Sequence, residues 1–163
     1  CGIDGNMIRV HQKDPELGLV GEIDAIDTSI IESVLDNGYI PVISSVGVDE
    51  MGNAYNINAD TVAAKVAGAL KAEAMIAMTN IDGVLEDKDD PTTLLTNLTL
   101  EDVEELKERG IIAGGMIPKV DCCTLAIAEG VAKVFIINGE IPHAILIELL
   151  TNEGLGTMFV KEH

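Results

Sequence analysis

The sequence predicts an α/β protein with a largely parallel open sheet sandwiched by helices. Three apolar runs rich in β-branched residues have the composition of buried strands, at residues 39–46, 74–79 and 133–137. Helical patterns lie between and after these runs, and such alternation favours parallel pairing. Hydrophobic residues make up 47% of the chain, but aromatic residues only 2%. Aliphatic side chains must therefore fill the core, which suits this class better than a β-sandwich.

The signals that start and stop helices place four of them in the chain. The helices are expected at residues 60–70, 99–109, 118–129 and 141–150, and a closing strand at 155–160. Asp60 and Thr99 are of the types that cap helix N-termini. Pro118 suits the first position of its helix, and Gly130 lies just past the end of that helix.

The segment before residue 50 follows a different pattern. Residues 1–10 and 18–22 predict an antiparallel hairpin, and residues 28–37 predict a short helix. Because the chain opens on Cys1 rather than Met, and a strand-like segment follows almost at once, we expect it to begin inside a longer protein.

The formal net charge of −18 disfavours nucleic acids and anionic membranes as partners, since both require basic patches. No apolar run reaches the ~18 residues of a spanning helix, and no signal peptide opens the chain. The three cysteines have no CxxC spacing, as expected of reduced thiols in a cytoplasmic protein. If such an acidic protein binds a polyanion such as ATP, lysines, helix N-termini and a divalent metal must reverse the local field.

The segment with the clearest signal of chemistry is Ile-Ile-Ala-Gly-Gly-Met-Ile-Pro-Lys at residues 111–119. Gly114 and Gly115 let the backbone approach a ligand closely. Lys119 then falls in the first turn of a helix, where a cation is unfavourable unless an anion neutralises it. An ordinary loop with an exposed lysine is the alternative, and this segment alone does not decide between them.

Two further segments have the composition of ligand-binding turns. Asn56 and Asn58 alternate as in a strand just before a helix, so that both can face one ligand, and Asp60 can cap that helix or hold a lysine. Solvated asparagines and a simple cap are the alternative. Residues 79–85 follow a buried strand at the edge where open α/β sheets bind ligands, although a tight turn explains them equally well.

Several common motifs are absent from the sequence. It contains neither GxxxxGK[ST] nor GxGxxG, which excludes a Walker A loop and a dinucleotide fingerprint. The three histidines have no metal-ligand spacing, so we expect no metal held by the protein alone.

Taken in order, six segments resemble the amino acid kinase family, and within it the members that act on N-acetyl-L-glutamate. These segments are residues 18–22, 38–43, 55–63, 79–85, 110–120 and 143–158. The resemblance implies ATP-dependent phosphorylation, with Mg²⁺, of the side-chain carboxylate of N-acetyl-L-glutamate, the second step of arginine biosynthesis. It also implies an amino acid kinase-like fold.

The resemblance also implies roles for individual residues. Asn56 and Asn58 would contact acetylglutamate, Lys119 would bind the nucleotide phosphates and stabilise the transferring phosphoryl group, and Asp60 would hold the catalytic lysines in place. The other nucleotide-binding residues would be Thr79, Asn80, Ile111, Gly114, Gly115 and Met116. Phosphoryl transfer requires positioning and charge neutralisation, which agrees with these roles.

Some features of the family are missing from this chain. The glycine-rich turn with a second catalytic lysine, and the substrate arginine, have no counterpart, so the chain corresponds to a C-terminal fragment incomplete at its N-terminus. Residues 1–54 would be the trailing part of the amino-acid-substrate domain, and residues 55–163 the ATP-binding domain. Because one of two phosphate-binding lysines is absent, we expect the fragment alone to be inactive or nearly so.

The C-terminal segment resembles that of arginine-inhibited members. The residues expected to bind L-arginine as a feedback effector are His143, Glu153, Gly154 and Gly156. The resemblance further implies a homo-oligomer, a dimer or a hexamer in the full-length protein. Two alternatives stay open at this point: another family member acting on glutamate, aspartate, carbamate or uridine monophosphate, and a non-catalytic nucleotide-binding domain.

Overall fold

The computed structural model describes residues 1–151 and 154–162. The chain divides into two compact units, Cys1–Leu70 and Lys71–His163. The domain boundary expected from the resemblance lies at 54/55, whereas the boundary between the compact units follows Leu70, after the next helix. No helix of the described residues is long and apolar enough to cross a membrane.

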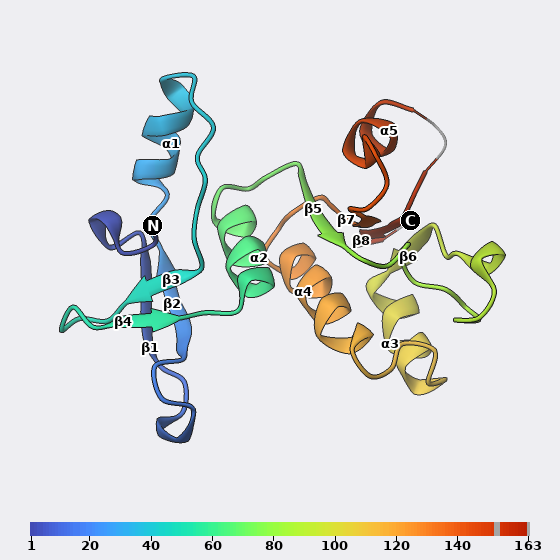
Figure 1. Ribbon diagram of the computed structural model, residues 1–163, viewed down its shortest axis with the longest axis horizontal. Helices are drawn as coiled ribbons and strands as arrows, with labels where there is room; N and C mark the ends of the chain where they lie inside the picture. Colours follow the sequence, from blue (N-terminus) through green and yellow to red (C-terminus); the bar gives the residue numbers. More distant parts are fainter. Residues whose placement is uncertain (152–153, 163) are drawn as a thin grey trace. The chain divides into compact units, whose positions relative to one another are not determined.

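The first unit is built on a mixed four-stranded sheet (Figure 1). Its strands, in spatial order, are β2 (Gly21–Ile26), β1 (Ile8–Gln12), β3 (Val46–Val48) and β4 (Ala54–Asn56). β1 and β2 form the predicted antiparallel hairpin, β1 pairs in parallel with β3, and β3 pairs antiparallel with β4. Two helices belong to this unit, α1 (Ser29–Asp36) at the predicted position and α2 (Ala59–Ala69).

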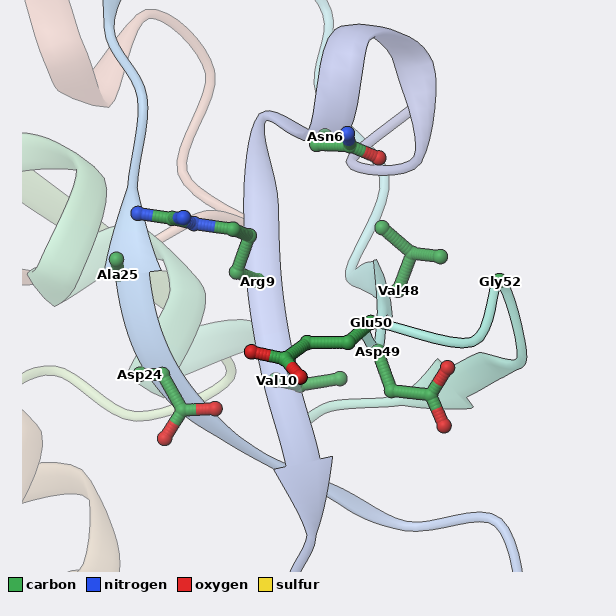
Figure 2. A pocket seen from close by; sticks show the side chains of 9 residues that line it. All are labelled: Asn6, Arg9, Val10, Asp24, Ala25, Val48, Asp49, Glu50 and Gly52. Carbon is green, nitrogen blue, oxygen red and sulfur yellow. The ribbon is translucent and has the colours of Figure 1, made fainter.

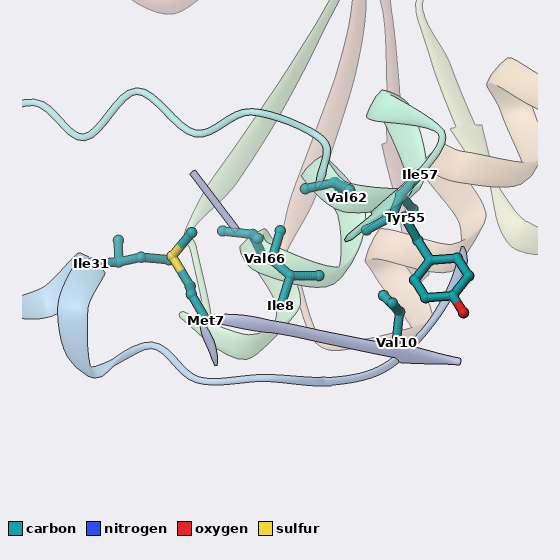
Figure 3. Close-up of a cluster of buried hydrophobic side chains, with 8 residues drawn as sticks. All are labelled: Met7, Ile8, Val10, Ile31, Tyr55, Ile57, Val62 and Val66. Atoms are coloured by element: carbon teal, nitrogen blue, oxygen red, sulfur yellow. The ribbon is translucent and has the colours of Figure 1, made fainter. Parts of the chain in front are cut away.

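The core of the first unit lies where α2 packs against the sheet (Figure 3). Ile8 and Val10 of β1 and Tyr55 of β4 alternate with exposed neighbours, so that each strand turns one side inward. Val62 and Val66, one helical turn apart, bring the apolar side of α2 onto them. The buried side chains of this core are Met7, Ile8, Val10, Ile31, Tyr55, Ile57, Val62 and Val66.

The strand predicted at residues 39–46 is wrong for most of its length. Only Val46 lies in a strand, β3, while residues 39–45 are outside any strand. Tyr39, Ile40 and Val42 are 70%, 89% and 92% exposed. The apolar, β-branched composition was correctly identified, but a strand also requires a neighbour, and no strand of the described residues pairs with residues 39–45.

The second unit contains another mixed four-stranded sheet, in the order β5 (Ala74–Thr79), β7 (Lys133–Asn138), β8 (Thr157–Val160) and β6 (Asn97–Thr99). β5 pairs in parallel with β7, β7 antiparallel with β8, and β8 in parallel with β6. The strands predicted at 74–79 and 133–137 are confirmed. β6, like β4, was missed because three residues are too short to display a period of two.

Three helices cover this second sheet: α3 (Leu100–Glu108), α4 (Met116–Ala128) and α5 (Ala144–Leu150). Side chains of β7 alternate between the faces of the sheet. Phe135 and Ile137 form a cluster with Ala144 of α5, and the alternation assigns Val134 and Ile136, both 0% exposed, to the opposite face; α4 also contacts β7. The unit is therefore a helix–sheet–helix sandwich, and the predicted α/β class is confirmed. Short 3-10 turns complete the chain at Asp4–Asn6, Pro15–Leu17 and Pro91–Thr93.

The ends of α2 and α3 show how local hydrogen bonds set helix boundaries. Thr99 caps α3 as predicted, and Asp102 accepts from the Thr99 backbone in return, which completes a capping box. The predicted cap of α2 was wrong, because Asn58, not Asp60, accepts the hydrogen bond from the Thr61 amide at 3.0 Å. Asp60 lies inside the first turn of α2 instead.

The starts of α4 and α5 also differ from the prediction. α4 begins at Met116, so that Pro118 is its third residue rather than its first. The first turn of a helix still tolerates proline there, since its missing N–H would be unpaired anyway. α5 begins at Ala144 rather than residue 141, because His143 adopts a left-handed conformation with φ of 63°.

Gly156 lies where any side chain would collide with the sheet. A Cβ at this position would approach the Ile136 carbonyl oxygen to 2.0 Å. We expect Gly156→Ala to lower the free energy of unfolding by about 1–3 kcal/mol in urea denaturation, since overpacking forces the backbone to move. Gly115→Ala is the matched control, because no atom lies within 4 Å of its Cβ position. Equal stability of the two variants would contradict the packing described here.

Candidate nucleotide site

A cavity of about 850 Å³ opens in the second unit between two loops. One wall is the loop that follows β5, residues 80–88, and the other is the segment between α3 and α4, which contributes Gly110, Ile111, Ala113 and Met116. This volume falls within the roughly 300–1,000 Å³ typical of small-molecule pockets. The cavity lies at the carboxyl end of the parallel strand β5, where open α/β sheets bind ligands.

Hydrogen bonds from the sheet brace the first wall at its start. The Gly139 amide donates to the Thr79 carbonyl at 2.8 Å, and the Asn138 side chain donates to Asp82 Oδ1 at 2.7 Å. Thr79 Oγ1 accepts from the Ile81 amide at 3.0 Å. The residues that end the two parallel strands therefore fix the turn from which the wall departs.

Thr157 fixes the same wall further along. Its side chain is 0% exposed, and Oγ1 accepts a hydrogen bond from the Val84 amide at 2.8 Å. The neighbouring Gly83 has φ of 137°, and a Cβ there would lie 2.6 Å from this hydroxyl. A residue without a side chain is required at position 83 so that the loop can reach Thr157.

The second wall begins where α3 ends. Gly110 adopts a left-handed conformation, its amide donates to the Lys107 carbonyl, and the Ile111 amide donates to the Leu106 carbonyl. This pattern satisfies the last carbonyls of α3 and turns the chain away from the helix. The next side chain, Ile112, is 1% exposed and anchors the segment in the core.

Arg109 joins the two walls. Its guanidinium contacts Glu86 of the first wall at 3.0 Å and Glu105 of α3 at 3.4 Å. The side chain is 48% exposed, so this pair adds little to stability. It nevertheless neutralises one of the carboxylates that line the cavity.

The structure places the residues predicted to bind nucleotide in two groups. Asn80, Ile111 and Met116 line the cavity. The others lie beside these elements: Thr79 ends β5, Gly114 and Gly115 form the turn before α4, and Lys119 lies in the first turn of α4. The additional lining residues are Ile81, Asp82, Gly83, Val84, Leu85, Glu86, Asp87, Lys88, Gly110 and Ala113. Residues 81–85 belong to a turn that the sequence had singled out, whereas the acidic stretch 86–88 gave only the signal of an exposed loop.

Lys119 is the fourth residue of α4 and is half-buried. Within the described residues of its own unit, its ammonium group makes no ion pair and no hydrogen bond. Lys107 shows the contrast, because it contacts Glu104 at 2.9 Å and Asp121 at 3.0 Å. The hydrogen bond to Glu104, followed by that to Asp121, raises the pKa of Lys107 above its usual value. Lys107 thus ties α3 to α4, while Lys119 retains an uncompensated charge.

In the first unit, Asn56 and Asn58 are exposed and alternate with buried Tyr55 and Ile57, as the sequence predicted. The Asn56 amide donates to the Leu19 carbonyl at 2.9 Å, which places the hairpin loop beside it. Asn58 Oδ1 is engaged as the cap of α2, so its amide NH₂ is the group left to donate to a ligand.

The roles of Asp60 and of the predicted effector residues stay predictions. Asp60 belongs to the first unit and Lys119 to the second. His143 is exposed, Gly154 has φ of 44°, and Gly156 is buried against β7. Glu153 lies outside the described residues.

A second cavity, of about 640 Å³, lies on the first unit between β1, β2 and the turn after β3 (Figure 2). Its charged lining is one guanidinium, of Arg9, and three carboxylates, of Asp24, Asp49 and Glu50. Neither Asn56 nor Asn58 lines it. Three carboxylates against one cation disfavour a dicarboxylate such as acetylglutamate in this cavity.

Asp49 in that cavity has a structural role. It accepts hydrogen bonds from the amides of Met51 and Asn53 and from the Tyr55 hydroxyl. The hydrogen bond from the Asn53 side chain, the largest cause, holds the pKa of Asp49 below its usual value. Its carboxylate therefore organises the β3–β4 turn.

Comparison with known proteins identifies the class of protein. The model of the amino acid kinase family matches residues 1–138. The chain belongs to the amino acid kinase family.

Among relatives, the chain is 49% identical to the acetylglutamate kinase of Brachyspira hyodysenteriae, covering 99% of the chain and 57% of that protein. It is 51% identical to the acetylglutamate kinase of Clostridium kluyveri, covering 97% of the chain and 56% of that protein. The chain thus spans just over half the length of the curated relatives it matches.

A solved structure adds a likeness in three dimensions. N-acetylglutamate synthase from Neisseria gonorrhoeae, complexed with coenzyme A and L-arginine, superposes with a TM-score of 0.85 at 28% identity. The match covers 97% of this chain and 37% of the synthase.

The Thr157 hydroxyl can be tested as the support of the first wall. Thr157→Val leaves the buried Val84 amide without its acceptor, and we expect a loss of about 1–3 kcal/mol in unfolding free energy. Amide exchange at Val84 should accelerate at the same time. Thr157→Ser retains the hydroxyl and should keep Val84 protected. Unchanged protection of Val84 in Thr157→Val would contradict this role.

Proposed function

We propose that this chain is the nucleotide-binding portion of an acetylglutamate kinase, which transfers a phosphoryl group from ATP to the side-chain carboxylate of N-acetyl-L-glutamate. The observation that carries the proposal is Lys119, which makes no ion pair among the described residues of its unit and lies in the first turn of α4, three residues after Met116 of the cavity lining. The likeness to acetylglutamate kinases at 49–51% identity supports the choice of substrate.

The cavity and the start of α4 suit different parts of ATP. The apolar side chains of Ile111, Met116 and Leu85 offer contact to the adenine ring. The start of α4 offers the positive end of the helix dipole to the phosphates, although the Met116 and Ile117 amides there already donate to the Ala113 and Gly114 carbonyls. Lys119 adds a full positive charge there, which holds the γ-phosphate and stabilises charge that develops during transfer.

Mg²⁺ would accompany the nucleotide rather than occupy a site formed by the protein alone. No group of three or more His, Cys, Asp or Glu side chains in the described part of the chain is arranged to hold a metal ion. Mg²⁺ in phosphotransferases commonly takes one or two carboxylates together with substrate phosphates and water. The acidic side chains along the first wall, Asp82 and Asp87, are candidates.

Acetylglutamate is assigned to Asn56 and Asn58 of the first unit, whose amide groups can donate to a carboxylate or to the acetyl oxygen. Asp60, two residues after Asn58, is proposed to hold the catalytic lysines in place. The 163-residue chain alone is expected to bind nucleotide yet to show little or no turnover. The proposal has three further parts. They are inhibition by L-arginine through His143, Glu153, Gly154 and Gly156, assembly as a homo-oligomer, and a cytoplasmic location.

Lys119→Met tests the nucleotide assignment in the chain as it stands. We expect about a tenfold or larger loss of affinity for Mg-ATP by isothermal titration calorimetry, since a charge-assisted hydrogen bond contributes about 1.5–3 kcal/mol. Affinity for adenosine, which has no phosphate, should not change. Lys133→Met removes the same charge at the opposite end of the sheet, where β7 begins, and should leave both affinities unchanged.

Equal losses for ATP and adenosine would mean that Lys119 does not contact the phosphates. A kinase assay on the full gene product then separates the enzyme from a non-catalytic nucleotide-binding domain. Turnover with acetylglutamate, and not with glutamate, aspartate, carbamate or uridine monophosphate, is the expected result.

A further inference from the structure

The first turn of α4 is held only weakly by the residues that form it. Gly115, at the N-cap, has no side chain that could bond the first amides, and Gly114 before it adopts a φ of 55°. No atom lies within 4 Å of the Cβ position of either glycine. The amides of Met116 and Ile117 donate within this turn at 3.2 and 3.3 Å, at the long end of the usual range. The orientation of the turn therefore depends on contacts further along the helix.

Two of the contacts that hold α4 lie just after this turn. Val120 is 0% exposed and fixes one side of the helix in the core of its unit. Asp121, the next residue, contacts the ammonium group of Lys107 on α3 at 3.0 Å. Because successive residues of an α-helix differ by about 100°, the two contacts act on different sides of α4. Together they define the rotation of the helix about its own axis.

Lys119 lies on the side of α4 away from this ion pair. It is two positions before Asp121, which places the two side chains about 160° apart around the helix. Lys119 is also three positions after Met116, and residues with this spacing share one side of a helix. Met116 lines the cavity between the two loops. The rotation that directs Asp121 at Lys107 thus also turns Lys119 to the side of the cavity lining.

We propose that Lys107 and Asp121 are positioning residues, which hold α4 in the rotation that presents Lys119 to the phosphates of a bound nucleotide. Neither of the two is among the residues that line the cavity. Lys107 is anchored on the side of α3, where it also contacts Glu104 at 2.9 Å and its side chain is 26% exposed. The positioning role rests on the proposed function, because it acts through the contact of Lys119 with phosphate.

A purely electrostatic effect of the two charges predicts a different outcome from positioning. Removing the positive charge of Lys107 would weaken the binding of an anion through the electric field, whereas removing the negative charge of Asp121 would strengthen it. Loss of a positioning contact weakens binding whichever partner is removed. The signs of the two changes therefore separate the explanations.

The test measures the affinities of the 163-residue chain for Mg-ATP and for adenosine by isothermal titration calorimetry. Lys107→Met and Asp121→Asn should each weaken Mg-ATP binding by about two- to fivefold, the range expected for one partly exposed ion pair, and leave adenosine binding unchanged. The double variant should bind no more weakly than either single variant, since both remove the same contact. Changes of opposite sign in the two single variants, or equal losses for adenosine, would overturn the proposal.

Two further variants are matched controls. Glu104→Gln removes the other partner of Lys107 with the same change of charge as Asp121→Asn, but Glu104 belongs to α3, so Mg-ATP affinity should not fall. Lys107→Arg retains the cation and should bind Mg-ATP as tightly as the unaltered chain. A loss in either control as large as that of Asp121→Asn would overturn the assignment.

The Lys119→Met background separates this role from the proposed function. Adding Lys107→Met in that background should cost no further Mg-ATP affinity, because the ion pair acts through Lys119. A further loss of about two- to fivefold would overturn the positioning role and leave the nucleotide assignment intact. Mg-ATP affinity that Lys119→Met itself leaves unchanged would overturn the proposed phosphate contact, and the positioning role with it.

Discussion

The parallel pairing of β5 with β7 is the constraint on which the second unit depends. These strands lie more than fifty residues apart, and their register runs from Ala74 opposite Lys133 to Thr79 opposite Asn138. β7 is almost completely buried, with Val134, Ile136 and Ile137 at 0% exposure. Because parallel strands end at the same edge, the residues that follow Thr79 must leave the sheet beside Asn138 and Gly139. The cavity exists because the loop departs at that point and returns to Thr157.

The electrostatics of this site depend on a small number of positive charges, because the chain as a whole is acidic. Lysine and arginine together number 10 against 28 acidic residues. Two of these cations have structural partners: Lys107 holds α4 against α3, and Arg109 joins the two walls through Glu86. Lys119 differs from these two because it lies at a helix N-terminus and makes no ion pair among the described residues of its unit. An unpaired lysine at such a position favours an anionic ligand more than a neutral one.

The sequence predicted those elements whose signals are local. The strands at 74–79 and 133–137 are apolar runs, although only Met75 of β5 is buried, and α3 has a capping box that begins at Thr99. The sequence did not predict features that depend on contacts between residues far apart in the chain. Nothing in the sequence near Thr157 indicates that its hydroxyl accepts from Val84, 73 positions away. Residues 39–45 have strand composition, yet composition cannot supply the neighbouring strand that pairing requires.

The same distinction applies to the candidate site. Asn80, Ile111 and Met116 were identified from turns and glycines, and they line one cavity. Glu86, Asp87 and Lys88 have only the composition of an exposed loop, and the return of the chain toward Thr157 makes that loop a wall. The choice of Asp60 as a helix cap was wrong for a local reason: Asn58 and Asp60 are both capping types, and the helix begins at Ala59, two residues earlier than a cap at Asp60 requires.

The account rests on the cavity of the second unit being the nucleotide site. Backbone amide chemical shifts measured by NMR while Mg-ATP is added to the 163-residue chain test this most directly. The account predicts that the largest changes fall on residues 80–88 and 110–119, with little change around the cavity of the first unit. Changes centred on Arg9, Asp24 and Asp49, or no saturable change anywhere, would contradict it.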